Sequence, residues 1–313
     1  MPNWNDVLKE LQANNRGAHD NLRLKYLKKI QRHTKRNVLA YYSGWLHKPQ
    51  LRGNPATEFH IVDADKTGFM TCSHGVDRKK GLDLILHTPG GDVAATESLI
   101  DYLHSLYNGN IRAIVPQLAM SGGTLIALSC REIVMGRHSS IGPVDPQIGN
   151  MPAQGLLEEF ERAAADLQKS AALIPLWQPI IAKYWPTLIT SAQHAVDWSD
   201  QLLRKYLTQC MFAKDTAADR NTKIDKIANM LGKQKTSKSH SRHITPDTAR
   251  DLGIKVIELE KDQTLQNLVL TLHHAYTHTL TQTNAIKIIE NHLGVAHVNQ
   301  VQVIVSPTGD ARR

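Results

Sequence analysis

Apolar residues recur at helical spacing in two stretches near the start of the chain. These residues are Trp4, Val7, Leu8 and Leu11 in the first stretch, and Leu24, Leu27 and Ile30 in the second. Residues three and four apart share one face of a helix. The polar stretch Asn14–Gly17 separates the two patterns. We predict two helices between residues 4 and 34, forming an arm that packs on the core or on a neighbouring subunit.

Short apolar runs then alternate with helical stretches. The predicted strands cover residues 38–42, 82–87, 111–116 and 132–135, and residues 59–62 begin a strand or a helix. Near-continuous apolar runs are typical of strands that are buried on both faces. The predicted helices cover residues 93–106 and a segment that begins at Ser121. This alternation predicts an α/β fold with a parallel sheet and crossover helices.

The second half of the chain is mainly helical by the same criteria. We predict helices over residues 156–172, 192–212, 263–276 and 284–291, and a helix that starts at Thr245-Pro246-Asp247. One further strand is predicted over 255–259, a flexible loop over 233–239, and a frayed tail after Thr308. The expected organisation is a helical N-terminal arm (1–36), a core (37–262), and C-terminal helices with a tail (263–313).

Composition narrows the class of protein. The chain has 313 residues, of which 41% are apolar, and no apolar run reaches the ~18 residues of a spanning helix. Its first residues are polar, so we expect a cytoplasmic protein and no membrane partner. The formal net charge of +8 is more typical of a solvated basic face than of a nucleic-acid partner. The three cysteines form neither a metal-binding nor a disulfide pattern.

No cofactor or metal site is predicted. The chain lacks a phosphate-binding G-x-x-x-x-G-K-[ST] loop, so ATP would have to come from a separate ATPase or regulatory partner. It also lacks a G-x-G-x-x-G dinucleotide motif after a strand. His274 and His278 stand four residues apart, a spacing that can bind a metal, beside His273. Without flanking acidic or thiol ligands, we interpret these histidines as a hydrogen-bonded, partly buried set.

Two glycine-bearing turns are the strongest chemical signal. His87-Thr88-Pro89-Gly90-Gly91 ends one predicted strand, and Met120-Ser121-Gly122-Gly123 precedes a helix. In parallel sheets, sites gather at the carboxyl ends of strands. Free N–H groups at a helix start and in a glycine turn attract negative charge, which suits the oxyanion of acyl transfer. The alternatives are that Ser121 only caps its helix and that the glycines form a plain turn.

These turns belong to an ordered series of sequence motifs that resembles the motifs of the serine dehydrogenase proteinases. These are Clp-fold serine peptidases of the Clp protease/crotonase superfamily, related to signal peptide peptidase A. The resemblance covers residues 38–294 and rests on Tyr41-Tyr42-Ser43, Asp83–Gly91, Ala119-Met120-Ser121, Gly142–Gln147, Ile244-Thr245 with Ala249–Gly253, and Lys287–Asn291.

The resemblance implies a Clp/crotonase-like fold and a serine endopeptidase that acts on protein or peptide substrates. Ser121 would be the nucleophile, and the N–H groups of Gly91 and Gly122 would stabilise the oxyanion. Superfamily members form rings or multimers, so a homo-oligomer is expected. Two other functions stay open: a crotonase-like enzyme acting on an acyl-CoA thioester, and an inactive scaffold that binds peptides or another protein.

The general base is harder to identify. Where the Clp peptidase has its histidine, the stretch Ile141–Gln147 has none. Signal peptide peptidases use a Ser-Lys dyad, and Lys169 is the lysine at the corresponding spacing. Burial would lower the pKa of such a lysine toward the working pH, although a surface lysine near a helix end is an equal alternative. His138 is the second candidate base.

His87 and Asp145 are two further polar residues near the predicted site. His87 lies in the strand before the glycine turn, where it shapes the site or serves as a structural hydrogen bonder. Asp145 is interpreted as a residue that lines the site or contacts another subunit, and its carboxylate could orient a base. We leave Asp145 outside the predicted dyad of Ser121 and Lys169.

Overall fold

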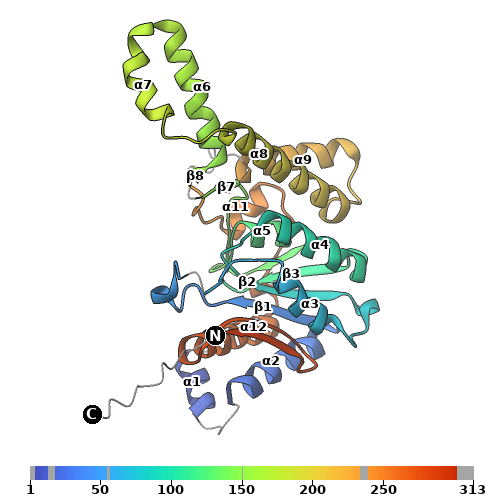
Figure 1. The fold of residues 1–313 in the computed structure, drawn as a ribbon. Coiled ribbons are helices and arrows are strands. Elements are labelled where there is room, and N and C mark those ends of the chain that lie inside the picture. The colour runs from blue at the N-terminus through green and yellow to red at the C-terminus, as the bar shows by residue number, and fades with distance from the viewer. Residues whose placement is uncertain (1–3, 13–17, 55–56, 150, 233–238, 302–313) are drawn as a thin grey trace, which may run out of the picture.

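A seven-stranded sheet forms the centre of the protein (Figure 1). The computed structural model describes residues 4–12, 18–54, 57–149, 151–232 and 239–301. The strand order is β11-β10-β1-β2-β3-β5-β9. Five neighbouring strands run parallel, and the last two in sequence pair antiparallel at one edge. The strands are β1 (Asn37–Ser43), β2 (Leu82–His87), β3 (Ile111–Val115), β5 (Ile133–Met135), β9 (Val256–Glu258), β10 (Ala285–Asn291) and β11 (Ala296–Gln300).

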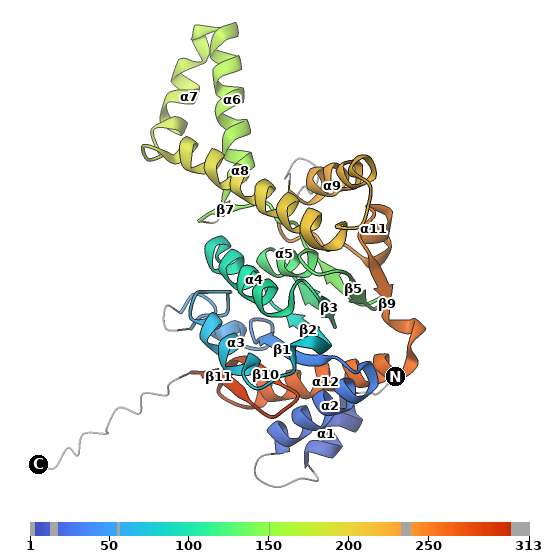
Figure 2. The same ribbon diagram turned by 90° about the vertical axis from the view of Figure 1, so that its right-hand side faces the viewer.

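Helices cover both faces of this sheet (Figures 1 and 2). On one face lie α2 (Ala18–Thr34) and α12 (Gln263–Gln282), with α1 (Trp4–Gln12) packed against them. The other face carries α3 (Asp65–Ser73), α4 (Val93–Tyr107) and α5 (Gly122–Leu128), and a further layer contains α8 (Leu188–Tyr206), α9 (Ala217–Leu231) and α11 (Pro246–Asp251). The two faces bury separate apolar clusters, as expected for a sheet enclosed by crossover helices.

Short strand pairs lie near the carboxyl ends of the central strands. Strand β4 (Leu118–Ala119) pairs with β6 (Ser140–Ile141), and β7 (Gln147–Ile148) pairs with β8 (Met151–Pro152). After β8 the chain leaves the body as a helical hairpin of α6 (Ala153–Lys169) and α7 (Ile174–Ile181), and it returns through α8 (Figure 2). This projecting hairpin and the start of α8 expose Leu167, Ile174, Leu176, Trp185 and Ile189.

Most elements predicted from the sequence are present. The chain has the predicted α/β architecture, with the parallel sheet, the crossover helices and the two-helix arm. Residues 59–62 are neither a strand nor a helix, but one bridge joins Ile61 to Gly91. The predicted loop 233–239 lies mostly outside the described residues, and the tail after Thr308 lies wholly outside them.

The prediction of a helix over residues 284–291 is wrong. This segment is β10, which pairs with β1 and is buried along its whole length. Its β-branched residues Ile286, Ile288 and Ile289 favour a strand, and a short apolar run cannot be assigned by periodicity alone. Between residues 263 and 301 the C-terminal segment therefore supplies one helix and two strands of the central sheet, rather than helices alone. The division at residues 36 and 262 stays a prediction.

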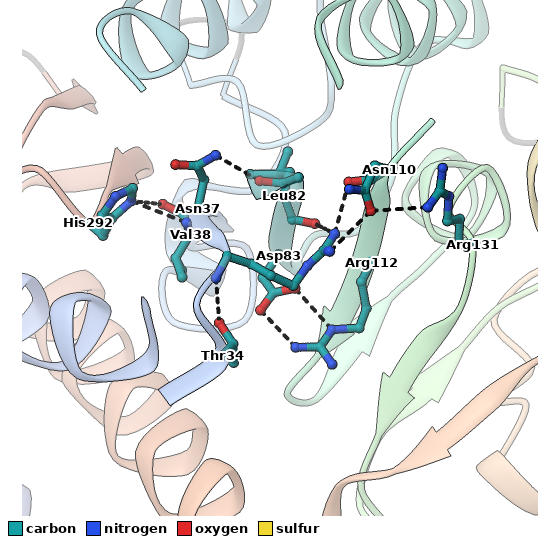
Figure 3. Close-up of polar contacts among 11 residues, drawn as sticks. Thr34, Asn37, Val38, Leu82, Asp83, Asn110, Arg112, Arg131 and His292 are labelled. Carbon is teal, nitrogen blue, oxygen red and sulfur yellow. Dashed lines mark hydrogen bonds and ion pairs between the residues drawn. The ribbon is translucent and has the colours of Figure 1, made fainter. Parts of the chain in front are cut away.

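A buried carboxylate joins the first strands at the end of the sheet opposite the glycine turns (Figure 3). Asp83 is fully buried, and it accepts hydrogen bonds from Arg36 and from both Nε and Nη2 of Arg112. Arg36 also donates to the backbone carbonyls of Leu82 and Asn110. A buried charge is tolerated when it is fully paired, so this network fixes the starts of β1, β2 and β3 relative to one another.

Histidines and aromatic rings pack together between the sheet and α12. The ring of His87 lies 5.3 Å from the rings of both Tyr42 and His273, and Tyr42 stacks on Tyr276 at 3.8 Å. Burial lowers the pKa of His273 to about 3, and it lowers the pKa of His87 well below its ordinary value. His87 is thus a packing residue between the sheet and α12, and neither of its buried ring nitrogens has the hydrogen-bond partner that the structural alternative expected. The neighbouring His273 is neutral near pH 7.

This cluster predicts acid sensitivity. An unfolded histidine takes up a proton near pH 6.5, whereas folded His273 resists protonation down to about pH 3. Stability is therefore fully present above pH 6.5 and declines as the pH falls through this window. From pH 7 to pH 5, His273 alone should cost roughly 2 kcal/mol in the free energy of unfolding. Between pH 7 and pH 5, the free energy of unfolding of His273→Gln should fall by roughly 2 kcal/mol less than that of the wild type, as measured by urea titration. Equal falls in the two proteins would contradict a neutral, buried His273.

Candidate active site

The two glycine-bearing turns lie directly against each other. Thr88 and Ala119 form a bridge, in which Met120 N–H donates to the Thr88 carbonyl at 3.0 Å. Gly90 has φ +93°, and a Cβ at this position would lie only 2.7 Å from the Cβ of Ser121. Only glycine fits this close approach. The predicted meeting of the two turns is therefore present in the structure.

Ser121 occupies the N-cap position of α5 with unusual backbone angles. Its φ is 50° and its ψ is −118°, a region that residues with side chains rarely adopt. The side chain makes no capping hydrogen bond, so the alternative of a simple cap does not hold. Instead, Ser121 lines a cavity of about 620 Å³ together with Gly91, Gly122 and Thr96. A strained backbone that presents a hydroxyl to a cavity is typical of a functional position.

Two backbone N–H groups converge beside Ser121. Ile61 bonds to the groups on either side of Gly91, accepting from Asp92 N–H and donating to the Gly90 carbonyl. The Gly91 N–H therefore points away from Ile61, and its nitrogen lies 3.3 Å from where a Gly122 Cβ would be. Gly122 is the first residue of α5, where a helix leaves its N–H groups free. This arrangement can stabilise an oxyanion.

A histidine that the sequence did not single out completes the cavity. His240 and Asp145 both line it, and His240 Nδ1 lies 3.0 Å from Asp145 Oδ1. Asp145 is 1% exposed, and Gln147 Nε2 donates to its other oxygen at 3.0 Å. With Nδ1 donating to the carboxylate, the Nε2 atom of His240 is left as a proton acceptor. Asp145 therefore fixes the orientation of the His240 ring, and it lines the cavity as predicted from the sequence.

One further contact joins the two segments that carry His240 and Asp145. Ile141 and Ile244 form an antiparallel bridge with hydrogen bonds in both directions. Continuing this register by four residues places position 145 opposite position 240. The sequence offered only a weak signal, because His240 stands far beyond the interval expected for a Clp histidine. It also adjoins a polar stretch without periodicity.

Within one chain, the two candidate bases predicted from the sequence lie outside the cavity of Ser121. Lys169 is the last residue of α6, is exposed, and belongs to the projecting hairpin. His138 is exposed and follows β5, near the α12 face of the sheet. Neither is among the described residues that line the cavity of Ser121. A contact between Lys169 and Ser121 requires a second copy of the chain, and it stays a prediction.

The described residues hold no group of His, Cys, Asp and Glu side chains arranged to bind a metal. His273 and His278 are buried in α12, and His273 Nδ1 lies 3.3 Å from the Tyr42 hydroxyl. His273 therefore fits the interpretation of a partly buried, hydrogen-bonded set.

Comparisons with known proteins identify a family and two relatives. The model of the family described as ClpP-like SDH-type serine proteinase matches residues 12–184. Uncharacterized protein MJ0137 of Methanocaldococcus jannaschii is 28% identical over 85% of this chain and 82% of its own length. Uncharacterized protein MJ1495 of the same organism is 34% identical over 45% of this chain and 47% of its own length. No solved structure matches the chain.

The backbone of Ser121 predicts a stability effect that is separate from chemistry. Glycine adopts positive φ without the steric cost that a Cβ imposes, a cost of order 1–3 kcal/mol. Ser121→Gly should therefore unfold at higher denaturant concentration than Ser121→Ala, by about 1 kcal/mol in the free energy of unfolding. Both variants lack the hydroxyl, so the comparison isolates the backbone. A less stable glycine variant would show that the positive φ carries no strain.

Proposed function

Because the chain belongs to the ClpP-like SDH-type serine proteinases, we propose that it hydrolyses peptide bonds with Ser121 as its nucleophile. The observation that carries this proposal is the shared cavity, into which Ser121, Gly91, Gly122, Asp145 and His240 all face. A nucleophile, an oriented base and two N–H donors are the parts that acyl transfer requires. The substrate class is protein or peptide.

The proposed reaction has two halves. Ser121 Oγ attacks the peptide carbonyl while His240 Nε2 accepts the hydroxyl proton, and Asp145 stabilises the resulting imidazolium. The N–H groups of Gly91 and Gly122 hold the oxyanion of the tetrahedral intermediate. The C–N bond then breaks, the leaving amine takes the proton from His240, and an acyl-enzyme remains. Water, deprotonated by the same histidine, releases the acid and restores Ser121.

We propose His240 rather than Lys169 as the base. His240 shares a cavity with Ser121 and has a buried carboxylate to orient it, whereas Lys169 is solvent-exposed within one chain. A catalytic lysine must lose its charge, which needs an apolar or positive environment. The Ser-Lys mechanism therefore depends on an assembly that would bury Lys169 against another copy's cavity.

The other two functions are less well supported. An acyl-CoA enzyme of the crotonase type would use the glycine turns to hold an enolate, would need a pocket for an adenine nucleotide, and would not need Ser121. An inactive scaffold would keep the turns without an oriented base. The hydrogen-bonded pair of His240 and Asp145 favours an enzyme over the scaffold, and the placement of Ser121 in the same cavity favours the peptidase.

A cytoplasmic location is part of the proposal. Within the described residues, no helix combines the length and the apolar character that a bilayer crossing requires. The proposed mechanism requires no cofactor. An ATPase or regulatory partner that delivers substrate is compatible with it.

The identity of the base can be tested with four alanine variants. Ser121→Ala and His240→Ala should each lower casein cleavage and fluorophosphonate labelling by a thousandfold or more, because residues that act as a unit fail together. Lys169→Ala and His138→Ala are the matched controls, and they should label at the wild-type rate.

Two outcomes would change the assignment. If Lys169→Ala abolished labelling while His240→Ala did not, the Ser-Lys mechanism would replace the histidine mechanism. If wild-type protein neither labelled nor cleaved casein, the scaffold function would be favoured instead.

We also propose that the chain forms a homo-oligomer through the projecting hairpin. Five large apolar side chains are exposed on the hairpin and at the start of α8, although such residues usually become buried. Hydrophobic burial of this kind is a common driving force of subunit association. The second copy is the expected occupant because superfamily members assemble with themselves.

Light scattering should give a mass at least twice the 35.0 kDa of the chain. Leu176→Glu combined with Trp185→Glu should shift the protein toward monomers, because charge on this surface opposes burial. A wild-type monomer at micromolar concentration that retained full activity would contradict the proposal.

A further inference from the structure

A short extended segment holds the candidate oxyanion turn in place. Residues Phe59–Val62 run beside the turn, and the backbone of Ile61 bonds to Gly90 and Asp92 at 2.8 and 2.9 Å. A Cβ at Gly91 would lie 2.2 Å from the Ile61 nitrogen, so the two backbones are in direct contact. The position of the Gly91 N–H therefore depends on where Ile61 lies.

Buried side chains anchor this segment on both sides of Ile61. Ser43 Oγ donates to the Phe59 carbonyl at 2.7 Å, and Lys287 Nζ donates to the His60 carbonyl at 2.7 Å. On the other side, Val62 N–H donates to Asp65 Oδ2 at 3.1 Å. The anchors come from β1, β10 and the start of α3, which belong to the rigid core.

Lys287 and Asp65 form the centre of this arrangement. Each is 1% exposed, and Nζ lies 2.9 and 3.0 Å from the two carboxylate oxygens. Tyr41 adds a hydroxyl donor to Asp65 at 2.9 Å. The ammonium group thus has three acceptors, the carboxylate pair and the His60 carbonyl, which matches its three protons. A fully paired buried ion pair has one favourable geometry, so it can fix the segment precisely.

We propose that Lys287, through Asp65 and the His60 carbonyl, is a positioning residue for the oxyanion donor at Gly91. This inference rests on the proposed peptidase function. It gives a role to Tyr41 and Lys287. Both belong to sequence motifs that contain none of the proposed catalytic groups. Oxyanion donors must lie 2.7–3.1 Å from the developing charge, and a misplacement of about 1 Å can cost a hundredfold in rate.

The test compares two buried ion pairs on the same strand. Lys287→Met breaks the pair that holds the segment. Arg23→Met is the control, since it breaks the buried pair of Arg23 and Glu290 (2.7 Å), which lies against α12 and contacts neither Ile61 nor Gly91. The readouts are kcat and KM for a peptide ester, the rate of fluorophosphonate labelling, and the affinity for a peptide boronate. Both variants are measured at a temperature where circular dichroism shows them folded.

Lys287→Met should lower kcat and the labelling rate by ten- to a hundredfold and weaken the boronate in parallel, while KM changes less than threefold. The pH profile of labelling should keep the shape that it has in the wild type, because His240 and Asp145 are untouched. Arg23→Met should lose thermal stability but keep kcat within about threefold. Equal kcat losses in the two variants, or an unchanged kcat in Lys287→Met, would overturn the inference.

A second variant covers the case in which Lys287→Met does not fold. Combining Lys287→Met with Asp65→Asn leaves no buried charge unpaired and keeps an acceptor for Val62 N–H, yet it removes the donor to His60. It should show the same fall in kcat at unchanged KM, and wild-type turnover would overturn the inference. Failure of the peptidase proposal itself is distinguishable, since wild-type protein would then not label at all.

Discussion

The close contact between the two glycine turns determines the rest of the candidate site. Gly90 packs on Ser121 so tightly that a Cβ at position 90 would clash with it, and Ser121 itself has a positive φ. The contact brings the Gly91 N–H beside the start of α5, and it directs the serine side chain into the cavity rather than onto the helix end. One steric constraint therefore sets the positions of both the proposed nucleophile and the proposed oxyanion donors.

Local patterns made the framework of the site predictable. Each turn follows an apolar strand and contains its glycines in consecutive positions, so Ser121, Gly91 and Gly122 could be found without knowledge of distant contacts. The parallel order of β1, β2, β3 and β5 follows from the same alternation. These features depend on neighbouring residues, which is why the sequence was sufficient for them.

Features that depend on long-range pairing were missed. The segment of β10 has a length and an apolar character that fit either a short helix or a strand, and only its pairing with β1 decides between the two. Likewise, His240 reaches the cavity because Ile244 pairs with Ile141, a contact between residues in separate parts of the chain. Lys169 was chosen by spacing along the sequence, but the projecting hairpin carries that position away from the body.

Buried charge explains how the site can carry a strained serine without relaxing. Asp83 with its two arginines fixes the starts of the central strands, and Lys287 with Asp65 fixes the segment behind Gly91 near their carboxyl ends. Each pair gains little net stability, because desolvation offsets most of its attraction. Each pair also penalises displacement, because movement would leave a buried charge unpaired. The protein thus uses ion pairs for geometry and its two apolar clusters for stability, and Ser121 lies where these constraints meet.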